Sequence, residues 1–112
     1  MSVEKLKNLE SKSLLFFKKH PELLDIVLFG SFRKGKEHPK DVDVLLLFKE
    51  KKNFEVMQEY RQLIDSALKM EVDALGKSYA ELFEIYFLAR TPFLSEGYSL
   101  LRKKAISESL GY

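Results

Sequence analysis

The sequence predicts a single α+β domain in which helices pack on a small β-sheet. Its 112 residues suit one domain with a core of its own. Hydrophobic residues make up 46% of the chain and include nine Phe and five Tyr, which supply the large side chains that a core needs. Segments with helical periodicity alternate with short apolar runs, which is the pattern of a sheet covered by helices.

The first half of the chain predicts one helix and two strands. Residues 3–19 carry apolar side chains at helical spacing, and Pro21 ends this helix. Residues 23–29 and 42–48 are almost continuous apolar runs, whose length and composition favour buried strands. Residues 31–40 form the loop between the strands, with room for one helical turn. The apolar face of the helix comprises Val3, Leu6, Leu9, Leu14, Phe16 and Phe17.

The second half predicts a helix, a strand and another helix. Residues 54–68 have helical apolar spacing. Residues 70–75 are typical of a third strand, which Gly76 ends. Ser78 then begins a capping-box pattern, so a helix is expected over residues 79–88.

Beyond residue 90 the sequence predicts short extended pieces and a last helix. Thr91-Pro92 breaks the preceding helix. Glu96-Gly97 marks a turn or a bulge within residues 93–101, and residues 100–110 form a final short helix. The order is therefore α-β-(α)-β-α-β-α in one domain over residues 1–112, with the N-terminal helix in residues 1–20.

Composition excludes several classes of protein. The net charge of +2 is too small to indicate nucleic-acid binding, and no Cys is present to form disulfides, thiolate zinc sites or a cysteine nucleophile. The N-terminus lacks the apolar core of a signal peptide, and no run approaches the ~20 apolar residues of a membrane helix. We therefore expect a soluble cytoplasmic protein without nucleic acid as its direct substrate.

Two carboxylates stand at the start of the second strand. Side chains alternate along a strand, so Asp41 and Asp43 share one face while Val42 and Val44 occupy the other. Two carboxylates about 6.6 Å apart along a strand can converge on one hard cation or on a pair of them. Alternatively, both are solvated residues that precede the strand.

The loop before these carboxylates has the composition of a phosphate site. Gly30 ends an apolar strand and permits close approach of a ligand, and the hydroxyl and N–H of Ser31 suit phosphate oxygens. Residues 30–36 match the first seven positions of the P-loop pattern, but Glu37 stands where a Ser or Thr must ligate Mg²⁺, and Pro39 prevents the required helix. The P-loop interpretation therefore fails. Positive charge in the loop comes from Arg33, Lys34, Lys36 and Lys40.

A third carboxylate would complete a two-metal site. Glu71 and Asp73 lie two residues apart on the third predicted strand and therefore share a face. Periodicity leaves the choice between them open.

These residues together carry a resemblance. Phe29-Gly30-Ser31, then nine residues, then Asp41-Val42-Asp43-Val44 resembles the signature of the DNA polymerase beta-type nucleotidyltransferase superfamily. Residues 72–75 resemble its third acidic strand, which favours Asp73, and residues 93–100 resemble its closing segment. The resemblance spans residues 22–101 and implies the nucleotidyltransferase fold with a mixed sheet. The chain length is similar to that of the minimal nucleotidyltransferases, abbreviated MNT.

The resemblance also implies site roles. Asp41, Asp43 and Asp73 would be catalytic and would hold two Mg²⁺ ions, with ATP as the substrate and AMP transferred to a hydroxyl. Gly30 and Ser31 would bind its phosphates. Arg33 and Lys34 occupy a stretch where many members have Ala-Arg, so positive charge is kept while the particular phosphate contact stays open.

The resemblance further implies a partner. Minimal nucleotidyltransferases commonly act as antitoxins that adenylylate a tyrosine of a helical HEPN-type toxin. The acceptor site would then come from that partner, because this chain has no acceptor domain. Two alternatives stay open: a non-catalytic module that neutralises its partner by docking, and a metal-dependent nuclease built on Asp41, Glu71 and Asp73. The nuclease pattern requires a lysine two residues after the second acid, and Lys77 does not fit it. Whether the chain forms a homo-oligomer also stays open.

Overall fold

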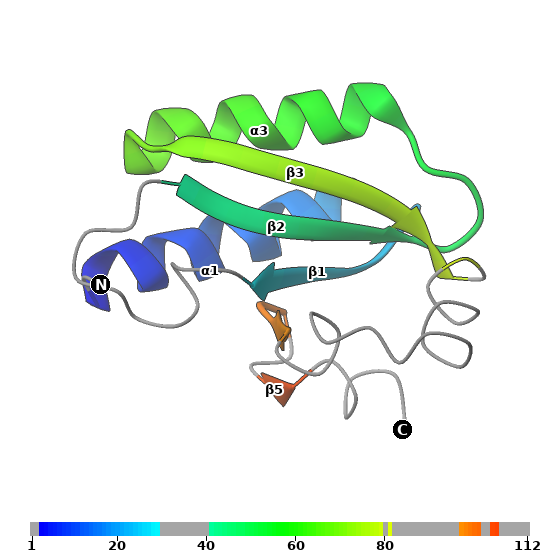
Figure 1. The fold of residues 1–112 in the computed structure, drawn as a ribbon, viewed down its shortest axis with the longest axis horizontal. Helices are drawn as coiled ribbons and strands as arrows, with labels where there is room; N and C mark the ends of the chain where they lie inside the picture. Colours follow the sequence, from blue (N-terminus) through cyan, green and yellow to red (C-terminus); the bar gives the residue numbers. More distant parts are fainter. Residues whose placement is uncertain (1–2, 30–40, 80, 82–96, 102–103, 106–112) are drawn as a thin grey trace.

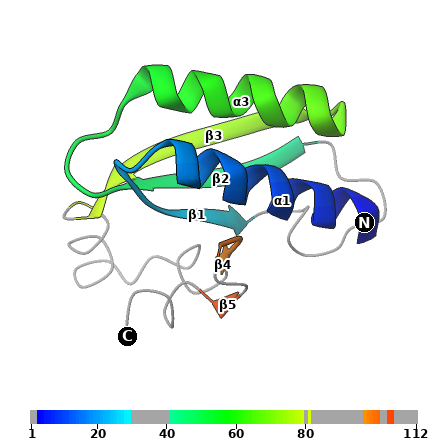
Figure 2. The same cartoon turned by 180° about the vertical axis from the view of Figure 1, so that it is seen from behind.

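The computed structural model describes residues 3–29, 41–79, 81, 97–101 and 104–105. Within these residues the chain forms one five-stranded sheet in the order β3-β2-β1-β4-β5, with two helices on one of its faces (Figures 1 and 2). No helix in this part of the chain is long and apolar enough to span a membrane. The elements are α1 (Val3–Lys19), β1 (Leu23–Phe29), β2 (Asp41–Phe48), α3 (Phe54–Leu68), β3 (Glu71–Ser78), β4 (Tyr98–Ser99) and β5 (Lys104–Ala105).

The sheet is mixed, as the resemblance implies. β2 pairs with β1 in antiparallel orientation and with β3 in parallel orientation. The parallel pairing requires a crossover, and α3 supplies it between β2 and β3. β4 and β5 add two short antiparallel strands beyond β1. The predicted α+β class is therefore confirmed, and so are the predicted bounds of α1, β1 and α3.

The apolar core lies between the sheet and the two helices. Alternate residues of β2 face the helices, and all of them are buried because the strand crosses the middle of the core. α1 and α3 lie side by side on this face (Figure 2). The core residues from these three elements are Leu9, Phe16, Val42, Val44, Leu46, Phe48, Val56, Tyr60, Ile64 and Leu68.

One predicted core position of α1 is wrong. Leu14 is 42% exposed, and Ser13 is fully buried in its place. The hydroxyl groups of Ser13 and Tyr60 are 2.7 Å apart and share a hydrogen bond. This bond satisfies both polar groups, which allows a serine to occupy the interface between the helices.

Both ends of α3 are fixed by local chemistry. The side-chain oxygen of Asn53 accepts hydrogen bonds from the backbone N–H groups of Glu55 and Val56, at 3.0 and 3.3 Å. At the other end Lys69 adopts the left-handed conformation with φ 55°, and its N–H donates to the carbonyl of Asp65 at 2.8 Å. α3 therefore begins and ends where the sequence predicts.

The third strand extends further than the sequence predicts. Gly76 was expected to end it, but β3 continues to Ser78. A Cβ atom at Gly76 would lie 2.5 Å from the Met57 sulfur and 3.4 Å from the Phe48 ring, so the glycine serves close packing beneath α3. Ser78 then accepts a hydrogen bond from the N–H of Glu81 at 3.2 Å, which agrees with the predicted cap.

The C-terminal prediction requires a correction. Residues 100–110 were expected to form a helix, but Lys104–Ala105 form strand β5, paired with β4. The edge of β4 offers unpaired backbone groups to a following strand, and this tertiary pairing overrides the local periodicity. The predicted loop over residues 31–40, residues 82–88 of the predicted helix, and residues 91–96 lie outside the described residues.

A buried carboxylate connects β1 to β4. Asp25 and Ser99 are both fully buried, and the Ser99 hydroxyl donates to Asp25 Oδ1 at 2.7 Å. The backbone N–H of Ile26 donates to the same oxygen at 2.8 Å. These bonds lower the cost of burying the carboxylate, and they tie the short strand β4 to the centre of the sheet.

Ser99→Ala is expected to lower the free energy of unfolding by about 1–3 kcal/mol, because a buried carboxylate would lose a hydrogen bond. Urea unfolding followed by circular dichroism measures this loss. Ser66→Ala, on the exposed side of α3, is the matched control and should change stability by less than about 0.5 kcal/mol. Equal effects of the two substitutions would show that the Ser99 bond contributes nothing.

Candidate active site

Adjacent parallel strands bring the predicted carboxylates together. In the register of β2 with β3, Asp41 pairs with Glu71 and Asp43 pairs with Asp73. Paired residues on neighbouring strands lie about 4.8 Å apart and project to the same side of the sheet. All four acidic side chains therefore project from one face, opposite to the face that α1 and α3 cover. We call this set of four residues the acidic cluster.

The electrostatics single out three members of the cluster. Burial raises the pKa of Asp43, and the negative charges of Asp41 and then Asp73 raise it further. Asp43 is half-buried, whereas Asp73 is exposed. Carboxylates that repel one another in this way form a set of hard oxygen donors whose repulsion a divalent cation would relieve. The chemistry of these oxygen donors therefore suits Mg²⁺.

The charges that raise the pKa of Asp43 are those of Asp41 and Asp73, and Glu71 pairs with Asp41 on the same face. Each acid of β3 thus pairs with one aspartate of β2, and the choice of Asp73 as the third carboxylate stays a prediction. Within the described part of the chain, no group of three or more His, Asp and Glu side chains is close enough to hold a metal ion. To hold a cation, the side chains of Asp41, Asp43 and Asp73 would have to turn toward one another, while the backbone kept its present positions on β2 and β3.

The strand that leads to the predicted phosphate loop ends beside the cluster. Phe29, the last residue of β1, pairs with Asp43. β1 therefore ends next to the carboxylates. Gly30, Ser31, Arg33 and Lys34 themselves lie outside the described residues, so their roles stay predictions.

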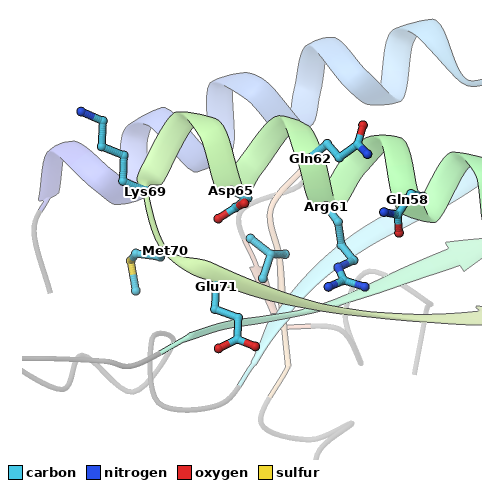
Figure 3. Close-up of a pocket in the computed structure, with 8 residues that line it drawn as sticks. Gln58, Arg61, Gln62, Asp65, Lys69, Met70 and Glu71 are labelled. Carbon is cyan, nitrogen blue, oxygen red and sulfur yellow. The ribbon is translucent and has the colours of Figure 1, made fainter.

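A groove runs along the outer side of β3, beneath α3. One hollow of about 320 Å³ is lined by residues of α3 and by Lys69, Met70, Glu71 and Val72 (Figure 3). A second hollow lies further along, between Phe54 and Ala74. Gln58 and Arg61 line both hollows, so Arg61 stands where they meet. No sequence motif includes Arg61, and the sequence alone does not indicate that it lines a groove.

Comparison with known proteins identifies the family. The profile described as "Polymerase beta, Nucleotidyltransferase" matches residues 12–86, more than half of the chain. The match includes β1, β2 and β3, and with them the acidic cluster. This chain belongs to that family. No curated protein matches the chain significantly.

Solved structures share the fold at low sequence identity. A toxin–antitoxin structure with AMP-PNP matches with a TM-score of 0.59 and 22% identity, over 91% of this chain and 84% of the other. A complex of MNT antitoxin with tri-AMPylated HEPN toxin from Shewanella oneidensis matches with a TM-score of 0.58 and 20% identity, over 95% and 84%. A nucleotidyltransferase-like protein from Sulfolobus solfataricus matches with a TM-score of 0.54 and 18% identity, over 87% and 79%. These likenesses confirm the nucleotidyltransferase fold.

Proposed function

We propose that this protein is an MNT-type antitoxin that transfers AMP from ATP to a tyrosine hydroxyl of a HEPN-type partner. One observation carries the proposal: Asp43, which follows Asp41 by two residues on β2, pairs with Asp73 on β3. The domain in which this pairing occurs belongs to the nucleotidyltransferase family. Such a set of carboxylates supports phosphoryl-group chemistry with divalent cations.

The proposed reaction assigns a task to each carboxylate. Asp41 and Asp43 would hold Mg²⁺ at the triphosphate, and Asp73 would hold an ion near the acceptor and accept the proton of its hydroxyl. Bound Mg²⁺ would stabilise the negative charge on the attacking and leaving oxygens. The hydroxyl oxygen forms a bond to the α-phosphorus as the bond to the bridging oxygen breaks, and pyrophosphate leaves. Gly30 and Ser31, with Arg33 and Lys34, would bind the phosphates.

The choice of acceptor is supported by the structural relatives. One relative contains AMP-PNP, and another is an MNT antitoxin in complex with an AMPylated HEPN toxin. The match covers 91% and 95% of this chain and 84% of each of those chains. A protein partner that supplies its own tyrosine is therefore the proposed acceptor.

Intact-mass spectrometry tests the proposal. The protein is mixed with Mg²⁺, ATP and the HEPN-type protein encoded by a neighbouring gene. The partner should gain the mass of one or more AMP groups, and this gain should disappear in Asp41→Asn. A tight complex without a mass change would favour the non-catalytic docking module instead.

The third carboxylate can be assigned by a matched pair of variants. Asp73→Asn is expected to reduce the rate of AMP transfer by about 100-fold or more, because it removes a metal ligand and the proton acceptor. Glu71→Gln, one position away on the same face, should change the rate by less than about threefold, since Asp73 rather than Glu71 pairs with Asp43. Initial rates of AMP incorporation measure both, and a larger effect of Glu71→Gln would reverse the assignment.

A further inference from the structure

An apolar row of side chains crosses the sheet next to the acidic cluster. Leu75 on β3 pairs with Leu45 on β2, and Leu45 pairs with Val27 on β1. Paired residues project to the same side of a sheet, so this row lies on the face of the cluster, directly beside the pair of Asp43 and Asp73. Leu45 and Val27 are buried, whereas Leu75 is 44% exposed. The row therefore ends in an open apolar surface two residues from Asp73.

Leu75 differs in position from the other exposed apolar side chains. Four large apolar side chains are exposed in the described part of the chain, and three of them, Leu14, Leu15 and Phe54, belong to α1 and α3. Leu75 is the member of these four that lies on the sheet, on the face opposite to the helices. A single exposed leucine is ordinary on a protein surface. Its place beside the carboxylate of Asp73 is what relates this one to the chemistry of the site.

A hydroxyl held at Asp73 leaves few places for an aromatic ring attached to it. The phenolic oxygen of a tyrosine is bonded directly to the ring, so the ring must lie close to Asp73. Toward β2 lies the carboxylate of Asp43. Along β3 the neighbours of Asp73 on the same face are Glu71 and Leu75, each about 6.6 Å away. The π-face of a ring is negative and disfavours a carboxylate, so the apolar side chain of Leu75 is the favourable contact.

We propose that Leu75 contacts the aromatic ring of the acceptor tyrosine and so selects a phenolic hydroxyl over the aliphatic hydroxyl of serine or threonine. This inference rests on the proposed function, because it specifies how the same site recognises its acceptor. Serine and threonine would reach Asp73 without covering Leu75 and would gain no apolar contact there. The contact involves one side chain of the partner, which a helix of that partner can present.

NMR spectroscopy of leucine methyl groups tests the contact without any transfer. The isotopically labelled protein is saturated with Mg²⁺ and an ATP analogue whose α,β-bridging oxygen is replaced by a methylene group. N-acetyl-tyrosinamide at about 10 mM should shift the Leu75 methyl signals upfield, because the ring current shields atoms above the ring. N-acetyl-serinamide should leave them unchanged. The methyl signals of Leu15, which is exposed on α1, should respond to neither probe.

Three results of this experiment would overturn the proposal. The first is no shift of the Leu75 signals at that concentration, and the second is an equal shift with N-acetyl-serinamide. The third is a shift that the ATP analogue produces alone and that N-acetyl-tyrosinamide does not extend, because the adenine ring would then occupy Leu75.

Kinetics with the HEPN-type partner supply a second test. Leu75→Ala should raise the KM for the partner about fivefold and change kcat by less than about twofold, since the ring contact is the same in the ground state and the transition state. Leu75→Met keeps an apolar side chain of similar volume and should restore the KM. Leu15→Ala replaces a more exposed leucine on α1 and is the matched control, which should change neither constant.

The ring contact and the proposed function can fail separately. If the partner gains AMP and Leu75→Ala leaves the KM unchanged, the ring contact is wrong and the proposed function stands. If N-acetyl-tyrosinamide shifts the Leu75 signals as expected while the partner never gains AMP, the proposed function fails and the ring contact stands.

Discussion

Asp43→Asn is expected to abolish Mg²⁺-dependent AMP transfer, with a loss of about 1,000-fold or more, while the fold remains intact. Asp43 is the central member of the acidic cluster, because it pairs with Asp73 and follows Asp41 on the same face of β2. Amide and carboxylate have nearly the same size, so the packing of β2 should not change. AMP incorporation into the HEPN-type partner measures the rate, and the far-ultraviolet circular dichroism spectrum checks the fold. Transfer at an unchanged rate would contradict the assignment of the carboxylates.

The same substitution should stabilise the protein in the absence of Mg²⁺. Burial and the neighbouring carboxylates raise the pKa of Asp43, so the folded chain binds this proton more tightly than the unfolded chain does. The contribution of Asp43 to stability is therefore present below the ordinary aspartate pKa of about 3.9 and is lost as the pH rises through the raised value. Asparagine has no such dependence.

Urea unfolding in the presence of EDTA tests this expectation. Near pH 4 the two proteins should be similar in stability, and at pH 7 Asp43→Asn should be the more stable. Adding Mg²⁺ should stabilise the unchanged protein more than the variant, since a cation relieves the repulsion. A variant that is less stable than the unchanged protein at pH 7 without Mg²⁺ would contradict the electrostatic explanation.

Tyr60→Ala is expected to give the largest loss of stability, about 3–5 kcal/mol. The Tyr60 side chain is fully buried between α1, α3 and the sheet, and its ring packs edge-to-face on Phe16 with centroids 5.2 Å apart. Its hydroxyl shares a 2.7 Å hydrogen bond with Ser13, and burial raises its pKa so that it stays protonated. Alanine would remove the ring and the bond together and would leave a cavity.

Tyr60→Phe separates the two contributions. It keeps the ring and leaves the Ser13 hydroxyl buried without this partner, so it should cost about 1–2 kcal/mol. Urea unfolding monitored by circular dichroism measures both variants. If Tyr60→Ala cost no more than Tyr60→Phe, the ring would not contribute to the core in the way its burial indicates.

Local patterns in the sequence predict most of the described fold. The bounds of α1, β1 and α3 follow from apolar periodicity and from breakers such as Pro21, whereas the cap that Asn53 provides for α3 is seen in the structure. Two features depend on tertiary contacts that such patterns do not contain. Gly76 is interior to β3 because Met57 and Phe48 pack against it, and β5 forms because β4 pairs with it.

The candidate site also combines features that the sequence predicts with features that only the structure shows. The shared face of Asp41 and Asp43 follows from their spacing on one strand. The pairing of Asp43 with Asp73 is a property of the parallel register between β2 and β3, which the sequence does not specify. Arg61 is an exposed residue on a helix surface, and only the position of α3 beside β3 reveals that it lines a groove.

The most direct test of the central claim is to locate a divalent cation on the protein. Mn²⁺ is added with ATP to isotopically labelled protein, and the paramagnetic broadening of each backbone amide signal is measured. We expect the strongest broadening at Asp41, Asp43 and Asp73, with a decline toward Phe48 and Lys77 at the other ends of β2 and β3, and a large reduction in Asp43→Asn. Broadening centred elsewhere in the chain, or unchanged in Asp43→Asn, would contradict a metal–nucleotide site at the acidic cluster.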